Sequence, residues 1–225
     1  MGISLKRLEQ KKLQVGISKL AGAGIDVERW LAMCDAGASE MARLAKVWPV
    51  FRPSFSYIAA TILGLSEESR DPLPEPAPGE VVIRVGAWSL QDLCACETVR
   101  DSNLMCVQDW YYKYPWSRAK LVPGVYRVRM PVPESNCKNF AGQKKLLLPG
   151  EEVTPVALAA TVLLCHLKQT GKDLLENDWT HCAEALPDGY RVALDLHDGP
   201  VFVLSLEDGN NSGNDYVWMS AARKC

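Results

Sequence analysis

The first 65 residues carry apolar side chains at helical spacing. Leu13, Ile17 and Leu20 recur at intervals of four and three, which places them on one face of a helix. Three later stripes of the same kind each begin at a capping residue and end at glycine or proline, over residues 26–35, 39–48 and 54–64. The pattern predicts four short helices in succession.

Beyond residue 79 the apolar period changes. Residues 81–87 and 125–132 are rich in β-branched side chains, and the second run alternates in a period of two. Residues 190–196 and 201–206 flank the turn sequence His-Asp-Gly-Pro, which indicates a hairpin. A last strand is expected within residues 215–220. These segments predict a mainly antiparallel sheet.

Two helices are predicted between these strands. Thr154 as N-cap and Pro155 as the first helical residue would begin a helix that continues to Lys168 and ends near Gly171. A shorter helix is predicted over residues 173–186. The longest apolar run has ten residues, which is about half the length needed to cross a bilayer, so no membrane association is expected.

The order of these elements predicts an α+β fold, with a short N-terminal helical segment followed by a mainly antiparallel sheet packed against one or two helices. Residues 71–79 contain four prolines in nine positions, which favours an extended linker. The predicted organisation is a helical segment over residues 1–70, a proline-rich linker over 71–79 and an α+β domain over 80–225.

The composition and the N-terminal charges indicate where in the cell the protein is expected. With 48% hydrophobic and 23% charged residues, the chain is expected to form a folded core. Lys11, Lys12 and Lys19 interrupt the stretch where a secretory signal would need an unbroken apolar run. A soluble cytoplasmic protein is therefore expected, in which the eight cysteines are mainly reduced thiols.

The N-terminal helices raise the question of nucleic-acid binding. The segments 26–35 and 39–48 have the spacing of a helix-turn-helix, and Arg43 and Lys46 could meet phosphates. Residues 1–70 hold ten Lys and Arg against seven Asp and Glu, a net charge of only +3. Such a small excess does not provide the basic stripe that supplies most DNA affinity.

Aromatic residues are concentrated at one place. Five of the 18 aromatic residues stand within positions 110–116, and consecutive side chains cannot all face one core. Outward-pointing Tyr and Trp beside a cation can contact a ligand or a partner, whereas the competing interpretation is an element whose rings cover both of its faces. The candidate binding residues are Trp110, Tyr111, Tyr112, Tyr114, Trp116, Arg118, Arg127 and Arg129.

The residues that could bind metal or catalyse a reaction are poorly spaced. Cys94, Cys96 and Cys106 lack the second close pair of a zinc site, and a calcium-loop opening at residues 208–213 lacks its closing Glu. The adjacent pair Cys165 and His166 would point about 100° apart on a helix. No metal and no cofactor are predicted.

These observations favour a non-catalytic protein that binds another protein or a small ligand through residues 110–116. The alternative is an enzyme whose Cys, His and acidic residues come together only in the folded C-terminal domain, for example Cys94 with His197. A further alternative is nucleic-acid binding through the N-terminal helices.

Overall fold

The structure is a computed structural model, and it describes residues 54–65, 71–175, 178–196, 200–206 and 217–225. The chain divides into two units, Met1–Phe51 and Arg52–Cys225, and every described residue belongs to the second. The three helices predicted before residue 50, the polar loop at 208–213 and His197 lie outside the described residues.

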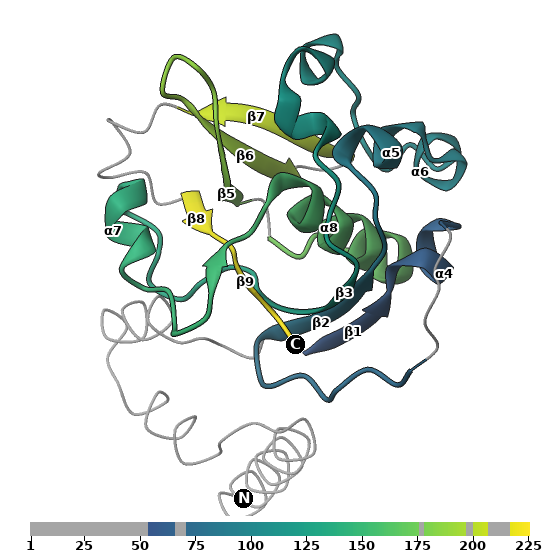
Figure 1. Cartoon of the computed structure of the whole chain (residues 1–225), viewed down its shortest axis with the longest axis horizontal. Coiled ribbons are helices and arrows are strands. Elements are labelled where there is room, and N and C mark those ends of the chain that lie inside the picture. Colours follow the sequence, from purple (N-terminus) through teal and green to yellow (C-terminus); the bar gives the residue numbers. More distant parts are fainter. Residues whose placement is uncertain (1–53, 66–70, 176–177, 197–199, 207–216) are drawn as a thin grey trace, which may run out of the picture. The chain divides into compact units, whose positions relative to one another are not determined.

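The first sheet of the second unit has five strands in the order β1-β2-β3-β9-β4 (Figure 1). Strands β1 and β2 are parallel, and the other neighbours are antiparallel. The strands are β1 (Phe55–Ile58), β2 (Glu80–Val85), β3 (Gly124–Arg129), β4 (Glu152–Val153) and β9 (Ala221–Lys224).

The second sheet has four strands in the order β7-β6-β5-β8. The hairpin predicted over residues 190–206 is confirmed, because β6 and β7 pair antiparallel from Arg191–Leu206 to Leu196–Val201. Strand β8 lies parallel to β5 at the edge of the sheet. The strands are β5 (Trp179–Ala185), β6 (Arg191–Leu196), β7 (Val201–Leu206) and β8 (Val217–Met219).

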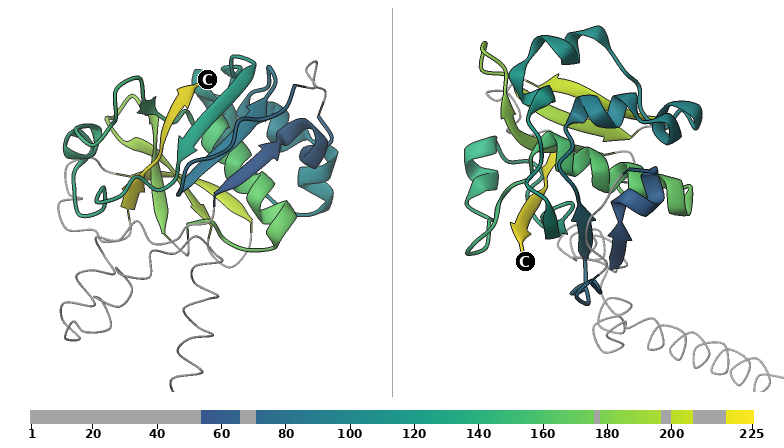
Figure 2. Two further views of the ribbon diagram at one scale, coloured as in Figure 1. Left: turned by 90° about the horizontal axis from the view of Figure 1, so that it is seen from below. Right: turned by 45° about the vertical axis from the view of Figure 1, so that its right-hand side comes forward.

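Helix α8 (Val156–Thr170) runs between the two sheets (Figures 1 and 2). All of residues 156–166 are buried, because one side of the helix packs on β2 and the other on β5, β6 and β7. A helix that is apolar all round is stable only when it is enclosed in this way. The helix ends as predicted at Gly171, whose φ of 66° suits glycine.

The start of α8 differs from the prediction. Pro155 is the N-cap, and the Thr154 hydroxyl makes no capping hydrogen bond. The Val156 N–H donates instead to the carboxylate of Glu184 on β5, at 2.9 Å. A residue 28 positions further along the chain therefore performs the capping that the local sequence does not provide.

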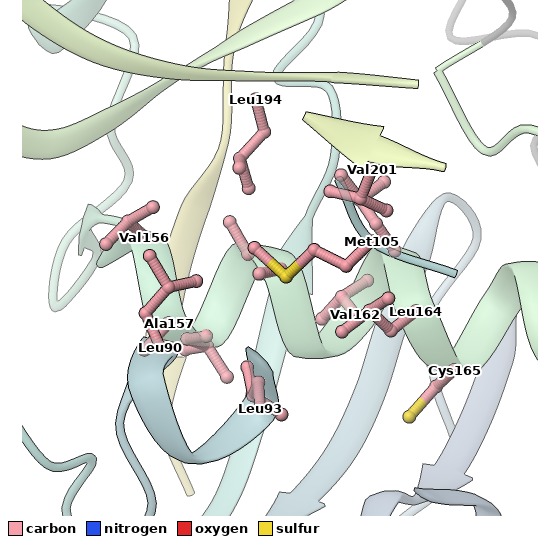
Figure 3. Close-up of a cluster of buried hydrophobic side chains, with 14 of the residues drawn as sticks. Leu90, Leu93, Met105, Val156, Ala157, Val162, Leu164, Cys165, Leu194 and Val201 are labelled. Carbon is pink, nitrogen blue, oxygen red and sulfur yellow. The ribbon is translucent and has the colours of Figure 1, made fainter. Parts of the chain in front are cut away.

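Short helices also pack against α8 and complete the core. Leu90 and Leu93 of α5 (Leu90–Ala95) pack in one apolar cluster with α8, together with Met105, which pairs with Val201 of β7 (Figure 3). The remaining helices are α4 (Ala59–Leu63), α6 (Glu97–Asp101), α7 (Phe140–Lys144) and the 3-10 turns η1 (Asp109–Lys113) and η2 (Pro115–Arg118). Within the described part of the chain, no helix combines the length and the apolar character that a bilayer crossing requires.

Two predicted helices are wrong. Residues 54–64 form strand β1 followed by the five-residue helix α4, because the backbone of residues 55–58 pairs with β2. Residues 179–185 form β5 rather than helix, because they pair with both β6 and β8. Short apolar runs suit either period, and the neighbouring strands decide between them.

The α+β class, with mostly antiparallel strands packed against a few helices, is confirmed, although the strands form two sheets rather than one. The proline-rich segment 71–79 lies within the second unit and follows the outer face of the five-stranded sheet. Arg127 of β3 donates to the Glu75 carbonyl at 3.0 Å, and the Ala77 N–H donates to the Glu80 carboxylate at 3.2 Å. The segment is thus tied to the sheet by its backbone.

Candidate functional site

The aromatic stretch forms two successive 3-10 turns, η1 and η2, with Pro115 at the first position of the second turn. A 3-10 helix has three residues per turn, so neighbouring side chains leave it about 120° apart. The rings of residues 110, 111 and 112 therefore take three different directions, which is why the stretch supplies both core and surface.

Tyr111 supplies the core. Its ring is fully buried, and its hydroxyl donates to the Cys106 carbonyl at 2.9 Å and accepts from the Val203 N–H at 3.0 Å. Burial raises the pKa of the Tyr111 hydroxyl to about 12. Of the candidate binding residues, Tyr111 therefore anchors η1 to strand β7.

Three other rings pack on one another and stay partly exposed. Tyr114 and Trp116 are stacked, with centroids 5.8 Å apart and an angle of 7° between the rings, and Trp110 meets both edge-on. We call Trp110, Tyr114 and Trp116 the aromatic cluster. Tyr112 beside it is 38% exposed, and Arg118 donates to the Tyr112 carbonyl at 3.0 Å.

Arg127 and Arg129 are not brought to the aromatic cluster. Side chains alternate along β3, so both arginines point away from the face that carries Tyr126. Arg127 contacts the Glu80 carboxylate at 2.7 Å, and Arg129 binds both oxygens of Glu151. These side chains belong to the outer face of the five-stranded sheet, where they neutralise acidic residues.

A cavity of about 640 Å³ adjoins the aromatic cluster, and Trp116 forms part of its wall. Most of the wall is apolar and comes from η2, from the start of α8 and from the inner face of β3, β9 and β4. We call it the Trp116 cavity. Its aromatic and charged lining comprises Trp116, Lys120, Tyr126, Glu152, Glu184, Arg223 and Lys224. A larger cavity of about 730 Å³ shares Lys120 and borders the undescribed residues 66–70 through Leu65 and Asp71.

Strand pairing explains how these side chains meet. Tyr126 of β3 lies opposite Lys224 of β9, and Glu152 of β4 lies opposite Ala222 of β9. Residues directly opposite each other share a face, and Ala222 and Lys224 share a face because they stand two apart. All four side chains therefore lie on the side of the sheet that faces α8.

Glu184 has the most perturbed carboxyl group of the cavity. Burial raises its pKa to about 6, although the hydrogen bond from the Val156 N–H works against this shift. The carboxyl group therefore changes its protonation state close to neutral pH, unlike an ordinary glutamic acid.

The two aromatic side chains of the cavity wall, Tyr126 and Trp116, differ in whether their polar atoms are hydrogen-bonded. The Tyr126 hydroxyl donates to the Val122 carbonyl at 2.8 Å, and burial raises its pKa. The Trp116 Nε1 atom is buried and has no hydrogen-bond partner among the described residues. A buried donor without an acceptor costs free energy, so Trp116 is held in place by packing rather than by its N–H.

The histidines of the described residues do not line the Trp116 cavity. His166 is hydrogen-bonded to the Tyr57 hydroxyl at 2.8 Å, and His181 Nδ1 to the Gln143 side-chain oxygen at 2.7 Å, both within the core. A tyrosine hydroxyl and an amide oxygen do not make a nucleophile-base pair with these imidazoles.

The cysteines are dispersed as well. Cys94 contacts the Met105 sulfur at 3.8 Å, and burial raises the pKa of its thiol to about 11. Cys96 donates to the Leu63 carbonyl, and burial raises the pKa of Cys165 and Cys182. Within the described ranges, no three His, Cys, Asp or Glu side chains come together as a metal site.

Comparison with known proteins adds no assignment: no family, no curated protein and no solved structure matches this chain. Of the cavity's aromatic and charged lining, sequence reasoning found only Trp116. The sequence shows that Tyr126 and Arg127 alternate on β3, but it does not show which face of the strand α8 covers. Glu152, Glu184 and Lys224 stand on three separate strands and carry no common local pattern.

Proposed function

We propose that this protein binds a small organic ligand in the Trp116 cavity, with the aromatic cluster at its rim. The observation that carries the proposal is the double role of Trp116, which stacks on Tyr114 in the cluster and also forms the wall of the cavity. The cavity volume of about 640 Å³ lies in the range of small-molecule sites, roughly 300–1,000 Å³.

The chemistry of the lining supports this proposal. A mostly apolar wall with a few charged groups is the usual composition of a ligand pocket, because burial supplies affinity and the polar groups fix the orientation. The sequence analysis expected either another protein or a small ligand as the partner. A concave site suits a small ligand better than it suits the surface of another protein. The proposal keeps the cytoplasmic location, for which the free thiols of Cys94, Cys96 and Cys165 are the support.

The test blocks the cavity without disturbing the core. Val122 lines the cavity and is 61% exposed, so Val122→Trp should fill the entrance while the fold stays intact. Val107 is 41% exposed and stands outside the cavity lining, so Val107→Trp is the matched control. A fragment library screened by saturation-transfer NMR on the full chain should give ligands that Val122→Trp removes and Val107→Trp retains. A screen in which both variants keep all ligands would refute the proposal.

A second candidate function rests on Glu184. A carboxyl group with a pKa of about 6 that shares a cavity with another carboxyl group, Glu152, suits general acid-base catalysis. This would be the enzyme whose acidic residues assemble only on folding. Hydrolysis of a panel of ester, amide and glycoside substrates by the wild type, lost in Glu184→Gln with ligand binding retained, would favour catalysis over binding alone.

A further inference from the structure

The charged side chains on the α8 side of the Trp116 cavity are separated by sign. Arg223 also lines the cavity, but it lies opposite Arg127 on the other face of the sheet and pairs there with Glu80. Lys120 lines both this cavity and the larger neighbouring one, so it stands at their common border. Lys224 reaches the same border: a Cβ atom on Gly124, which lines the larger cavity, would lie 2.5 Å from the Lys224 Cε. One end of the Trp116 cavity is therefore basic.

The other end is acidic. Glu152 lines the Trp116 cavity and also a third cavity whose wall includes Ala183, the neighbour of Glu184 on β5. Both carboxyl groups thus lie where β4 approaches β5, away from the border that the lysines share. Along β9, Ala222 opposite Glu152 and Lys224 are two residues apart, which is about 7 Å of strand.

The side chains that would attract a ligand form no direct ion pair with a described residue, although the charge of Lys120 helps to lower the pKa of Asp92 in the larger cavity. In the described part of the chain, Lys120, Lys224 and Glu152 take part in none of the ion pairs. Arg127, Arg129 and Arg223 form ion pairs with Glu80 and Glu151 on the outer face of the sheet. Between the two charged ends, the rings of Trp116 and Tyr126 provide an apolar wall.

We propose that the Trp116 cavity selects an amphoteric ligand, with a cationic group at Glu152 and Glu184, an anionic group at Lys120 and Lys224, and an apolar middle against Trp116 and Tyr126. A short peptide with free termini and an aromatic side chain has this chemistry. Opposite charges at the two ends give the ligand one orientation and exclude molecules that carry a single charge. This inference rests on the proposed function.

The test uses the tripeptide Gly-Phe-Gly in four forms: with free termini, N-acetylated, C-amidated and doubly capped. Calorimetric titration of the full chain should give the highest affinity for the free peptide. Each single cap should weaken binding about five- to tenfold, and both caps should weaken it further. Equal affinity for all four forms, or no binding of any form, overturns the inference.

Charge-removing variants assign each end of the peptide. Glu152 and Lys224 are exposed, so Glu152→Gln and Lys224→Gln should fold normally. Glu152→Gln should reduce the discrimination against the acetylated peptide only, because Glu184 remains, and Lys224→Gln should reduce the discrimination against the amidated peptide only, because Lys120 remains. Loss of both preferences in either variant also overturns the inference. Fragment ligands that Val122→Trp removes would leave the proposed function standing even if the peptides fail.

Discussion

The Tyr57 hydroxyl and His166 Nδ1 lie 2.8 Å apart inside the core, and their hydrogen bond joins the edge strand β1 to helix α8. Phe55 meets the same imidazole edge-on, at 4.5 Å between ring centroids. Because His166 is only 5% exposed, water cannot replace the tyrosine as its partner.

Removing the Tyr57 hydroxyl should therefore be costly. Tyr57→Phe keeps the ring and leaves His166 Nδ1 without its partner, which should lower the free energy of unfolding by about 1–3 kcal/mol. Tyr190→Phe, at a tyrosine that is 37% exposed, is the control and should change it by less than about 0.5 kcal/mol. Urea unfolding at pH 7.5 measures both variants, and equal stability of the two would contradict the role given to the Tyr57 bond.

His166 should also make the fold sensitive to acid. Burial lowers the pKa of His166, and the charge of Lys172 lowers it further. The unfolded chain, with its ordinary histidine pKa of about 6.5, then binds more protons than the folded one, so stability falls as the pH drops below about 6.5. Relative to its value at pH 7.5, the urea midpoint at pH 5.5 should be lower in the wild type than in His166→Gln.

Glu184 should act in the opposite direction. Its pKa of about 6 exceeds the ordinary value of 4.5, so the folded state binds more protons, and stability is lost as the pH rises from about 4.5 through 6. Glu184→Gln keeps an acceptor for the Val156 N–H and should gain at most about 2 kcal/mol at pH 7.5. Glu184→Ala also loses the cap and should be less stable than Glu184→Gln by about 0.5–2 kcal/mol. Thermal unfolding of the two variants separates capping from ionisation.

The neighbouring tyrosines of the aromatic stretch should respond differently to loss of the hydroxyl. Tyr111→Phe removes the partner of the buried Val203 N–H and should cost about 1–3 kcal/mol. Tyr112→Phe, at a ring that is 38% exposed, should leave the stability within about 0.5 kcal/mol of the wild type. Chemical denaturation of both variants provides the comparison, and a stable Tyr111→Phe variant would show that the hydroxyl does not anchor η1.

The sequence predicted the elements whose own composition is decisive. The ten-residue apolar run of α8, the alternating strand β3 and the turn sequence between β6 and β7 need no knowledge of their neighbours. Strands β1 and β5 were predicted as helices, because four to seven residues of mixed polarity fit both periods until a pairing partner is known.

The candidate site was predicted only where its residues are consecutive. Trp116 could be found because it belongs to a dense aromatic stretch, whereas Glu184 and Lys224 line the same cavity from strands of two different sheets. For Arg127 and Arg129, the sequence shows only that they alternate with Tyr126. This alternation places Arg127 and Arg129 on one face of β3 and Tyr126 on the other, but only the position of α8 decides which face lines the cavity.

Ser220 is the single residue between β8 at the edge of one sheet and β9 inside the other. Removal of the final nine residues would take the edge strand β8 from the four-stranded sheet. It would also take β9 from the five-stranded sheet, where β9 lies between β3 and β4. Because one residue joins β8 to β9, separation of either strand from its sheet would displace the strand in the other sheet. The second unit should consequently melt as one cooperative body, and the separation between the acidic and basic ends of the cavity should persist until that transition.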